Sequence, residues 1–255
     1  MRIRRVKIRI TRSIIPNLLT LGNLFSGFIA IIYIAKYEYE IAAIMILIAG
    51  FFDVLDGVVA RLIRATSAIG VELDSLCDAV SFGVAPSFML YTMFFYQFDP
   101  FGILLASLPA LSGVYRLARF NVLASYDDKL YFKGMPIPAS ALFISSFAVF
   151  QFQDPSLDTT LKNIMMFSVP LIASLSMIST VKFDNFPRPS WNAIKTHPWN
   201  FGITLLGIII STITRGYFIF YFMLFYILIS YIRFFFTSTK KGINSKKKSI
   251  IKKRT

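Results

Sequence analysis

Long apolar runs recur along the chain and constrain its fold more than any other feature. Each run approaches the roughly 20 residues that a helix needs to cross the ~30 Å hydrocarbon core of a bilayer. In lipid, the backbone must be hydrogen-bonded within the segment, so such runs fold as helices. Of the 255 residues, 56% are hydrophobic and only 16% are charged. Soluble domains carry roughly 25% charged residues, so the sequence predicts an all-α integral membrane protein.

Eight of these runs are interpreted as transmembrane helices. The first, from about 14 to 35, follows a basic arm at 1–13 and is too long for the apolar region of a signal peptide, so we expect a retained span. The others are expected at about 41–63, 70–95, 102–122, 136–152, 161–180, 200–213 and 216–236. The chain then divides into a six-helix core at 14–180, a cytosolic loop at 181–199, an additional two-helix hairpin at 200–236 and a disordered basic tail at 237–255.

The positive charge of the chain indicates its orientation. The formal net charge is +14, from 27 Lys and Arg against 13 Asp and Glu. If both termini are cytosolic, every basic residue except Lys36, Lys162 and Arg215 falls on the cytosolic side, as the positive-inside rule requires. The basic tail has no interleaved stacking aromatics, so we expect it to bind anionic lipid headgroups and no nucleic acid. The expected location is the inner (plasma) membrane of a bacterium.

Four aspartates interrupt the second and third apolar runs. Carboxylates at membrane depth are costly and normally functional. Asp53 and Asp56 are three residues apart and Asp74 and Asp78 are four apart, so each pair lies on one helix face. The turn at about 64–70 makes the two helices antiparallel neighbours, with both pairs at the cytosolic side. Four converging carboxylates need cations between them, and hard oxygen ligands suit Mg²⁺, Mn²⁺ or Ca²⁺. We expect two divalent ions, Mg²⁺ or Mn²⁺.

The first span carries a stripe of polar and small residues at roughly one-turn spacing, namely Asn17, Thr20, Asn23 and Gly27. Such a stripe is typical of close helix packing in membranes. It is equally compatible with a face turned toward the carboxylates, and the sequence favours neither interpretation. Cys77 is interpreted as a small core residue. A single histidine excludes any mechanism that needs two.

The aspartates belong to the pattern D-x2-D-G-x2-A-R-x8-G-x3-D-x3-D, which resembles the signature of the CDP-alcohol phosphatidyltransferase family at all eight positions. The resemblance covers about 14–180. It implies a six-helix core, dependence on divalent metal, and exchange of CMP for an alcohol on CDP-diacylglycerol. It implies metal ligation by Asp53, Asp56, Asp74 and Asp78, of which Asp78 is also the catalytic base. The residues expected to bind the CDP group are Asn17, Thr20, Gly57, Ala60, Arg61 and Gly70.

Three further blocks resemble the phosphatidylserine synthase branch of that family. They are DAVSFGVAP from Asp78, RLARFN from Arg116, and FKGMPIPASA from Phe132. The implied reaction transfers the phosphatidyl group from CDP-diacylglycerol to L-serine and gives phosphatidylserine and CMP. The acceptor is then expected to bind among Ser81, Arg116, Arg119, Asn121 and Lys133, with one of the three cations holding the serine carboxylate.

Two other functions stay open. A sister enzyme of the same family would use glycerol 3-phosphate, inositol phosphate or choline, with more basic residues or an aromatic cage around the acceptor. An ion transporter would thread its acids through the bilayer, whereas these aspartates cluster at one level. The resemblance also suggests a homodimer, with membrane lipids as further partners.

Overall fold

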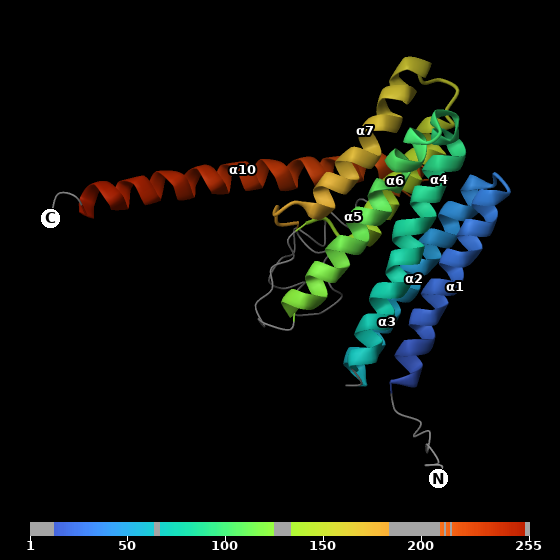
Figure 1. Ribbon diagram of the computed structural model, residues 1–255, viewed down its shortest axis with the longest axis horizontal. Coiled ribbons are helices and arrows are strands. Elements are labelled where there is room, and N and C mark those ends of the chain that lie inside the picture. The colour runs from blue at the N-terminus through green and yellow to red at the C-terminus, as the bar shows by residue number, and fades with distance from the viewer. Residues whose placement is uncertain are drawn as a thin grey trace, which may run out of the picture.

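Every regular element in the described part of the chain is helical, which confirms the all-α prediction. The computed structural model describes residues 13–63, 67–124, 134–183, 210–211, 213–214 and 216–252. The elements are α1 (Ile14–Ala35), α2 (Tyr39–Leu62), α3 (Ala68–Asp78), the π-helix η1 (Ala79–Val84), α4 (Ala85–Met93), the 3-10 helix η2 (Phe95–Phe98), α5 (Phe101–Ala124), α6 (Ile137–Ser146), the π-helix η3 (Phe147–Phe152), α7 (Thr159–Ile178) and α10 (Phe218–Lys252). In Figure 1, α1, α2 and α3 run side by side, whereas α10 runs across the direction of this bundle and projects beyond it.

Among the described residues, five helices are long and apolar enough to cross a membrane, which agrees with a multi-pass membrane protein. They are α1, α2, residues 101–122 of α5, α7, and residues 218–237 of α10. The expected span at 70–95 is built from three consecutive elements, α3, η1 and α4, and the one at 136–152 is built from α6 and η3. Most of the expected span at 200–213 lies outside the described residues. The count of eight spans therefore stays a prediction.

The end of the chain departs from the prediction. The sequence predicts a disordered tail from residue 237, whereas α10 continues as a helix to Lys252. Glycine and proline weaken a helix most, and Gly242 is the only one of either between these positions. Lysine is a good helix former. The apolar part of α10 supplies the helix nucleus, so the basic part only has to propagate it. The structure thus has a helix over much of the segment expected to be a disordered tail, and the division of the chain into these domains stays a prediction.

The helix α1 turns its small and polar residues inward. Its buried residues are Pro16, Thr20, Asn23, Ser26, Gly27, Ala30 and Ile34. Leu18, Phe25 and Phe28 are exposed, as expected of side chains that contact lipid. Small residues let neighbouring helices approach closely. Gly27 shows this most clearly, because a Cβ there would overlap Ser81 of η1.

Phenylalanine side chains pack the core between α4, α6, α7 and α10. Phe94 contacts Phe152 and Phe167 edge to face, with ring centroids 5.9 and 5.6 Å apart. Phe220 of α10 stacks on Phe143 of α6, with centroids 5.2 Å apart. Aromatic pairs of this kind add stability beyond the burial of their area. The first turns of α10 are thereby fixed to the bundle.

Candidate active site

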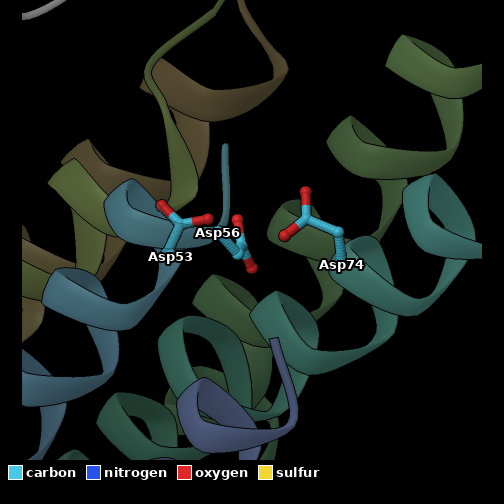
Figure 2. Close-up of side chains that lie close together, drawn as sticks. All are labelled: Asp53, Asp56 and Asp74. Atoms are coloured by element: carbon cyan, nitrogen blue, oxygen red, sulfur yellow. The ribbon is translucent and has the colours of Figure 1, made fainter. Parts of the chain in front are cut away.

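Three carboxylates from two helices converge at one point. Asp53 and Asp56, in the last turns of α2, face Asp74 of α3 (Figure 2). One oxygen of each lies within 4.8 Å of the others. The i, i+3 spacing places the first two on one face. Both α2 and α3 pack against α1, which brings the third to the same depth. The convergence that the spacing predicts is present for these three residues.

The surroundings of the three acids fit a cation. Asp56 is 6% exposed, and Oδ1 of Asp74 is buried with no hydrogen-bond partner among the described residues. Burial and neighbouring like charge both disfavour an ionised carboxylate, so this arrangement is costly by itself. Divalent cations that prefer hard oxygen ligands relieve the repulsion and supply the missing partner. The donor set therefore fits Mg²⁺ or Mn²⁺.

Two polar side chains of α1 hold acids from the other helices. The hydroxyl of Thr20 donates to Oδ2 of Asp56 at 2.6 Å, and Nδ2 of Asn23 donates to Oδ1 of Asp78 at 3.0 Å. The hydroxyl of Ser81 donates to the backbone oxygen of Asn23 at 3.1 Å. The stripe on α1 therefore both packs against its neighbours and faces the carboxylates. Asp78 lies outside the group of three acids, and its role as a fourth ligand stays a prediction.

A cavity of about 180 Å³ lies beside the acids, between α1, α2 and the start of α3. Its lining is Pro16, Asn17, Thr20, Asp56, Gly57, Ala60, Arg61, Ser67, Gly70, Val71 and Asp74. All six residues expected to bind the CDP group belong to this lining. Ser67 is a lining residue that the sequence reasoning missed. Its Oγ accepts from the backbone N–H of Gly70 at 3.0 Å as the N-cap of α3, and a serine just before an apolar helical run is a signal that could have found it.

Two of the predicted acceptor residues tie helices together. A guanidinium nitrogen of Arg119 donates to the carbonyl oxygen of Ile178, the last residue of α7, at 2.9 Å. The amide of Asn121 donates to Oγ of Ser75 in α3 at 3.0 Å. Carbonyl groups at a helix end lack intrahelical partners, and arginine satisfies them well. These contacts give both side chains a structural role.

Arg116 has a different environment. It is 6% exposed, and its Nε has no hydrogen-bond partner in the described part of the chain. Asp78 and Arg119 are among its charged neighbours. A buried guanidinium normally has its N–H groups paired, so an unpaired one leaves a donor available to an anionic ligand. Lys133, the remaining predicted cation, lies outside the described residues.

Comparison with known families agrees with this geometry. The model of the family described as CDP-alcohol phosphatidyltransferase matches residues 13–182. The chain belongs to the CDP-alcohol phosphatidyltransferase family. Every described residue assigned above to the metal, nucleotide or acceptor side lies within the matched part. As a CDP-alcohol phosphatidyltransferase, the chain extends beyond its family domain, because α10 begins after the match ends.

Similar proteins carry more specific names. A Helicobacter pylori (strain ATCC 700392 / 26695) protein named CDP-diacylglycerol–serine O-phosphatidyltransferase is 34% identical over 177 residues, which are 69% of this chain and 74% of that protein. A Bacillus subtilis (strain 168) protein of the same name is 34% identical over 189 residues, 73% of this chain and 98% of that protein. The archaetidylserine synthase of Methanothermobacter thermautotrophicus is 40% identical over 135 residues, 52% of this chain and 57% of that protein.

Proposed function

We propose that this CDP-alcohol phosphatidyltransferase transfers the phosphatidyl group of CDP-diacylglycerol to L-serine, giving phosphatidylserine and CMP. The names of its relatives support serine as the acceptor. The observation that carries the proposal is the convergence of three aspartates beside a cavity lined by all six residues expected to bind CDP. A nucleotide diphosphate and its divalent cations fit such a site, since carboxylates hold the cations and the cations hold the diphosphate.

On the nucleotide side, we assign Asp53, Asp56 and Asp74 as ligands of two divalent cations, Mg²⁺ or Mn²⁺, with Asp78 completing the set. When bound, the cations neutralise the diphosphate and stabilise the departing phosphate of CMP. The protein holds the donors in place, because the hydroxyl of Thr20 fixes Asp56 and the packing of both α2 and α3 against α1 fixes the distance between the acids. Arg61 and Gly57 line the cavity and offer a phosphate contact and an open backbone.

On the lipid side, exposed apolar side chains flank the cavity. Leu62 ends α2, Ile69 and Val71 begin α3, and all three are exposed. Apolar surface is favourable against acyl chains and unfavourable against water. A substrate with its nucleotide in the cavity and its diacylglycerol tails along this surface matches both environments.

On the acceptor side, the serine hydroxyl is a weak nucleophile at neutral pH and needs a base within hydrogen-bond reach. We assign that role to Asp78, which takes the hydroxyl proton. The serine oxygen forms a bond to the phosphorus that carries diacylglycerol, and the bond from that phosphorus to the oxygen of CMP breaks. Arg116 holds the serine carboxylate, because its guanidinium is buried near Asp78 with an unpaired Nε.

The test is CMP release by the purified protein with CDP-diacylglycerol, Mg²⁺ or Mn²⁺, and a panel of alcohols. We expect release with L-serine and none with glycerol 3-phosphate, inositol phosphate or choline. Release with glycerol 3-phosphate and not with serine would overturn the acceptor. Asp78→Asn should lose turnover and still bind Mn²⁺ through Asp53, Asp56 and Asp74, measured by electron paramagnetic resonance; unchanged turnover would overturn the base.

We further propose that the six-helix core and an additional hairpin span a bacterial plasma membrane, that both termini are cytosolic, and that the enzyme is a homodimer. The distribution of basic residues supports the orientation. In a Cys77→Ala background, an impermeant thiol reagent applied to intact cells should label Lys36→Cys and spare Lys240→Cys. The reverse pattern would contradict this orientation, and a monomer by sedimentation in detergent would contradict the dimer.

A further inference from the structure

A hydrogen bond between two buried side chains connects α1 to the proposed base. Nδ2 of Asn23 donates to Oδ1 of Asp78 at 3.0 Å. Asn23 is fully buried and Asp78 is 7% exposed, so water does not compete freely for this contact. The terminal torsion of an aspartate is soft, and its carboxylate direction therefore depends on its partners. Asn23 is the partner that the structure provides from another helix.

A second contact holds Asn23 in turn. Ser81 donates its hydroxyl to the backbone oxygen of Asn23 at 3.1 Å. Ser81 belongs to the π-helix η1, which begins directly after Asp78. Single π-helical turns within α-helices occur frequently at functional sites. Gly27, one turn beyond Asn23, allows the close approach of α1 to η1 that this contact requires.

The residue type at position 23 points to a functional reason. Oδ1 of Asn23 is buried with no hydrogen-bond partner among the described residues. An amide that only filled space would be costly there, because leucine has the same branched arrangement of side-chain heavy atoms and leaves no polar atom unpaired. The bond to Asp78 is the one side-chain contact in the described structure that explains an amide at this place.

We infer that Asn23 is a positioning residue, which holds the carboxylate of Asp78 toward the acceptor hydroxyl, and that Ser81 fixes Asn23 for this task. The inference rests on the proposed role of Asp78 as the base. It adds a residue of α1 to the acceptor side of the site, where Asp78 is the base. No part of it requires Asn23 to touch the substrate.

Asn23→Leu tests the inference because it keeps the branched side-chain skeleton and removes the donor. We expect kcat for CMP release to fall roughly 10- to 100-fold, the usual effect of removing a partner that orients a functional side chain. KM for serine and for CDP-diacylglycerol should stay within about two-fold. The affinity for Mn²⁺, measured by electron paramagnetic resonance, should fall much less than kcat, because Asp53, Asp56 and Asp74 stay in place. Ser26→Ala is the matched control. Ser26 is buried on the same helix, but its hydroxyl bonds to the carbonyl of Gly22 within α1, so kcat should not change.

Two results would overturn the inference. One is a kcat of Asn23→Leu equal to that of the unaltered enzyme. The other is a loss of Mn²⁺ affinity as large as the loss of kcat, which would assign Asn23 to the metal site. If Asn23→Leu does not fold, Ser81→Ala decides the question, because it leaves Asn23 in place and releases only its support. A folded Ser81→Ala should lose kcat by a few-fold, and an unchanged kcat would count against the inference.

A double-mutant cycle separates this inference from the proposed function. If Asn23 acts through Asp78, adding Asn23→Leu to Asp78→Asn lowers the residual rate no further. A further multiplicative loss would mean that Asn23 contributes independently of Asp78, and the inference would be wrong. An active Asp78→Asn would instead overturn the proposed base. If Asp78→Asn is inactive and Asn23→Leu is fully active, the inference about Asn23 is wrong and the proposed base stands.

Discussion

Replacing Gly27 by alanine should push α1 away from η1. The new Cβ would overlap Oγ of Ser81 and would lie 2.7 Å from its Cβ and 2.8 Å from its Cα, where ordinary contact begins at 3.4 Å. The two helices must therefore separate by roughly 0.6 Å to recover normal contact distances. The hydrogen bond from Ser81 to the backbone oxygen of Asn23 is 3.1 Å long now. The separation lengthens it beyond about 3.5 Å, where it no longer counts as a hydrogen bond.

The stability cost follows from these two effects. Overpacking a well-packed core costs typically about 1–3 kcal/mol, and losing a buried hydrogen bond adds about 1 kcal/mol. The lower entropy of an unfolded chain with alanine in place of glycine returns about 0.4–1 kcal/mol. The net destabilisation is about 2–3 kcal/mol, which corresponds to a Tm lower by about 5–10 °C for a chain of this size.

Thermal unfolding in detergent measures the effect, with Gly50→Ala as the matched control. Gly50 lies in α2, and a Cβ there would meet nothing closer than Phe82 at 3.9 Å. An equal Tm for the two variants would refute the reasoning. Restoration of the Tm of Gly27→Ala by Ser81→Gly would also refute it, because the backbone of Ser81 is itself too close and cannot be removed by shortening the side chain.

Three further predictions test separate parts of the molecule. Thr20→Val should weaken Mn²⁺ binding roughly 10- to 100-fold, because Asp56 loses its 2.6 Å hydrogen bond; an unchanged affinity in a paramagnetic resonance titration would contradict this. Arg116→Lys keeps the charge and loses the planar fork, so KM should rise for serine and not for CDP-diacylglycerol; equal rises would contradict its acceptor role. Hydrogen bonds, of which the one from Tyr217 has the largest effect, lower the pKa of Asp154 to about 2. An aspartate in an unfolded chain has a pKa of about 3.9. A depressed folded-state pKa stabilises the protein above about pH 4, and the contribution is lost as the pH falls through 2. The Tm of Tyr217→Phe should therefore lie below that of the unaltered protein at pH 6 and meet it near pH 2; a gap that persists at pH 2 would contradict the linkage.

Local periodicity explains why much of the site is predictable from the sequence. Asp53 and Asp56 share a helix face because the helical repeat places residues three apart together, whatever the rest of the fold does. Only five residues separate α2 from α3 in the sequence, and both helices pack against α1, so Asp74 lies at the same end of the bundle as the other two acids. The same reasoning places the predicted CDP-binding residues around one cavity, since each lies within a few turns of these acids or on the helix packed beside them.

Contacts between distant segments explain why the rest is not predictable. Arg116 and Arg119 are three residues apart in one motif, and nothing local separates them. Arg119 meets the end of α7, with a hydrogen bond to Ile178 across 59 positions of sequence, whereas Arg116 keeps a buried, unpaired Nε. The helical continuation of the basic tail is a different case. It depends on whether an already formed helix propagates, which charge patterning does not report.

The role of α1 is the hardest to predict from the sequence, because close helix packing and a face turned toward the carboxylates both produce a stripe of small polar residues. In this fold the same stripe does both. The close approach that Gly27 allows brings η1 within reach of Asn23, and Asn23 then reaches Asp78. Thr20, one turn earlier, reaches Asp56 by the same face. The acids of α2 and α3 are therefore oriented by a helix that carries no acid of its own. A chain that keeps all eight signature residues but has leucine in place of the α1 stripe should bind its nucleotide in a poor orientation and turn over slowly. We therefore expect turnover to require the eight signature residues together with the stripe on α1, which orients the acids among them.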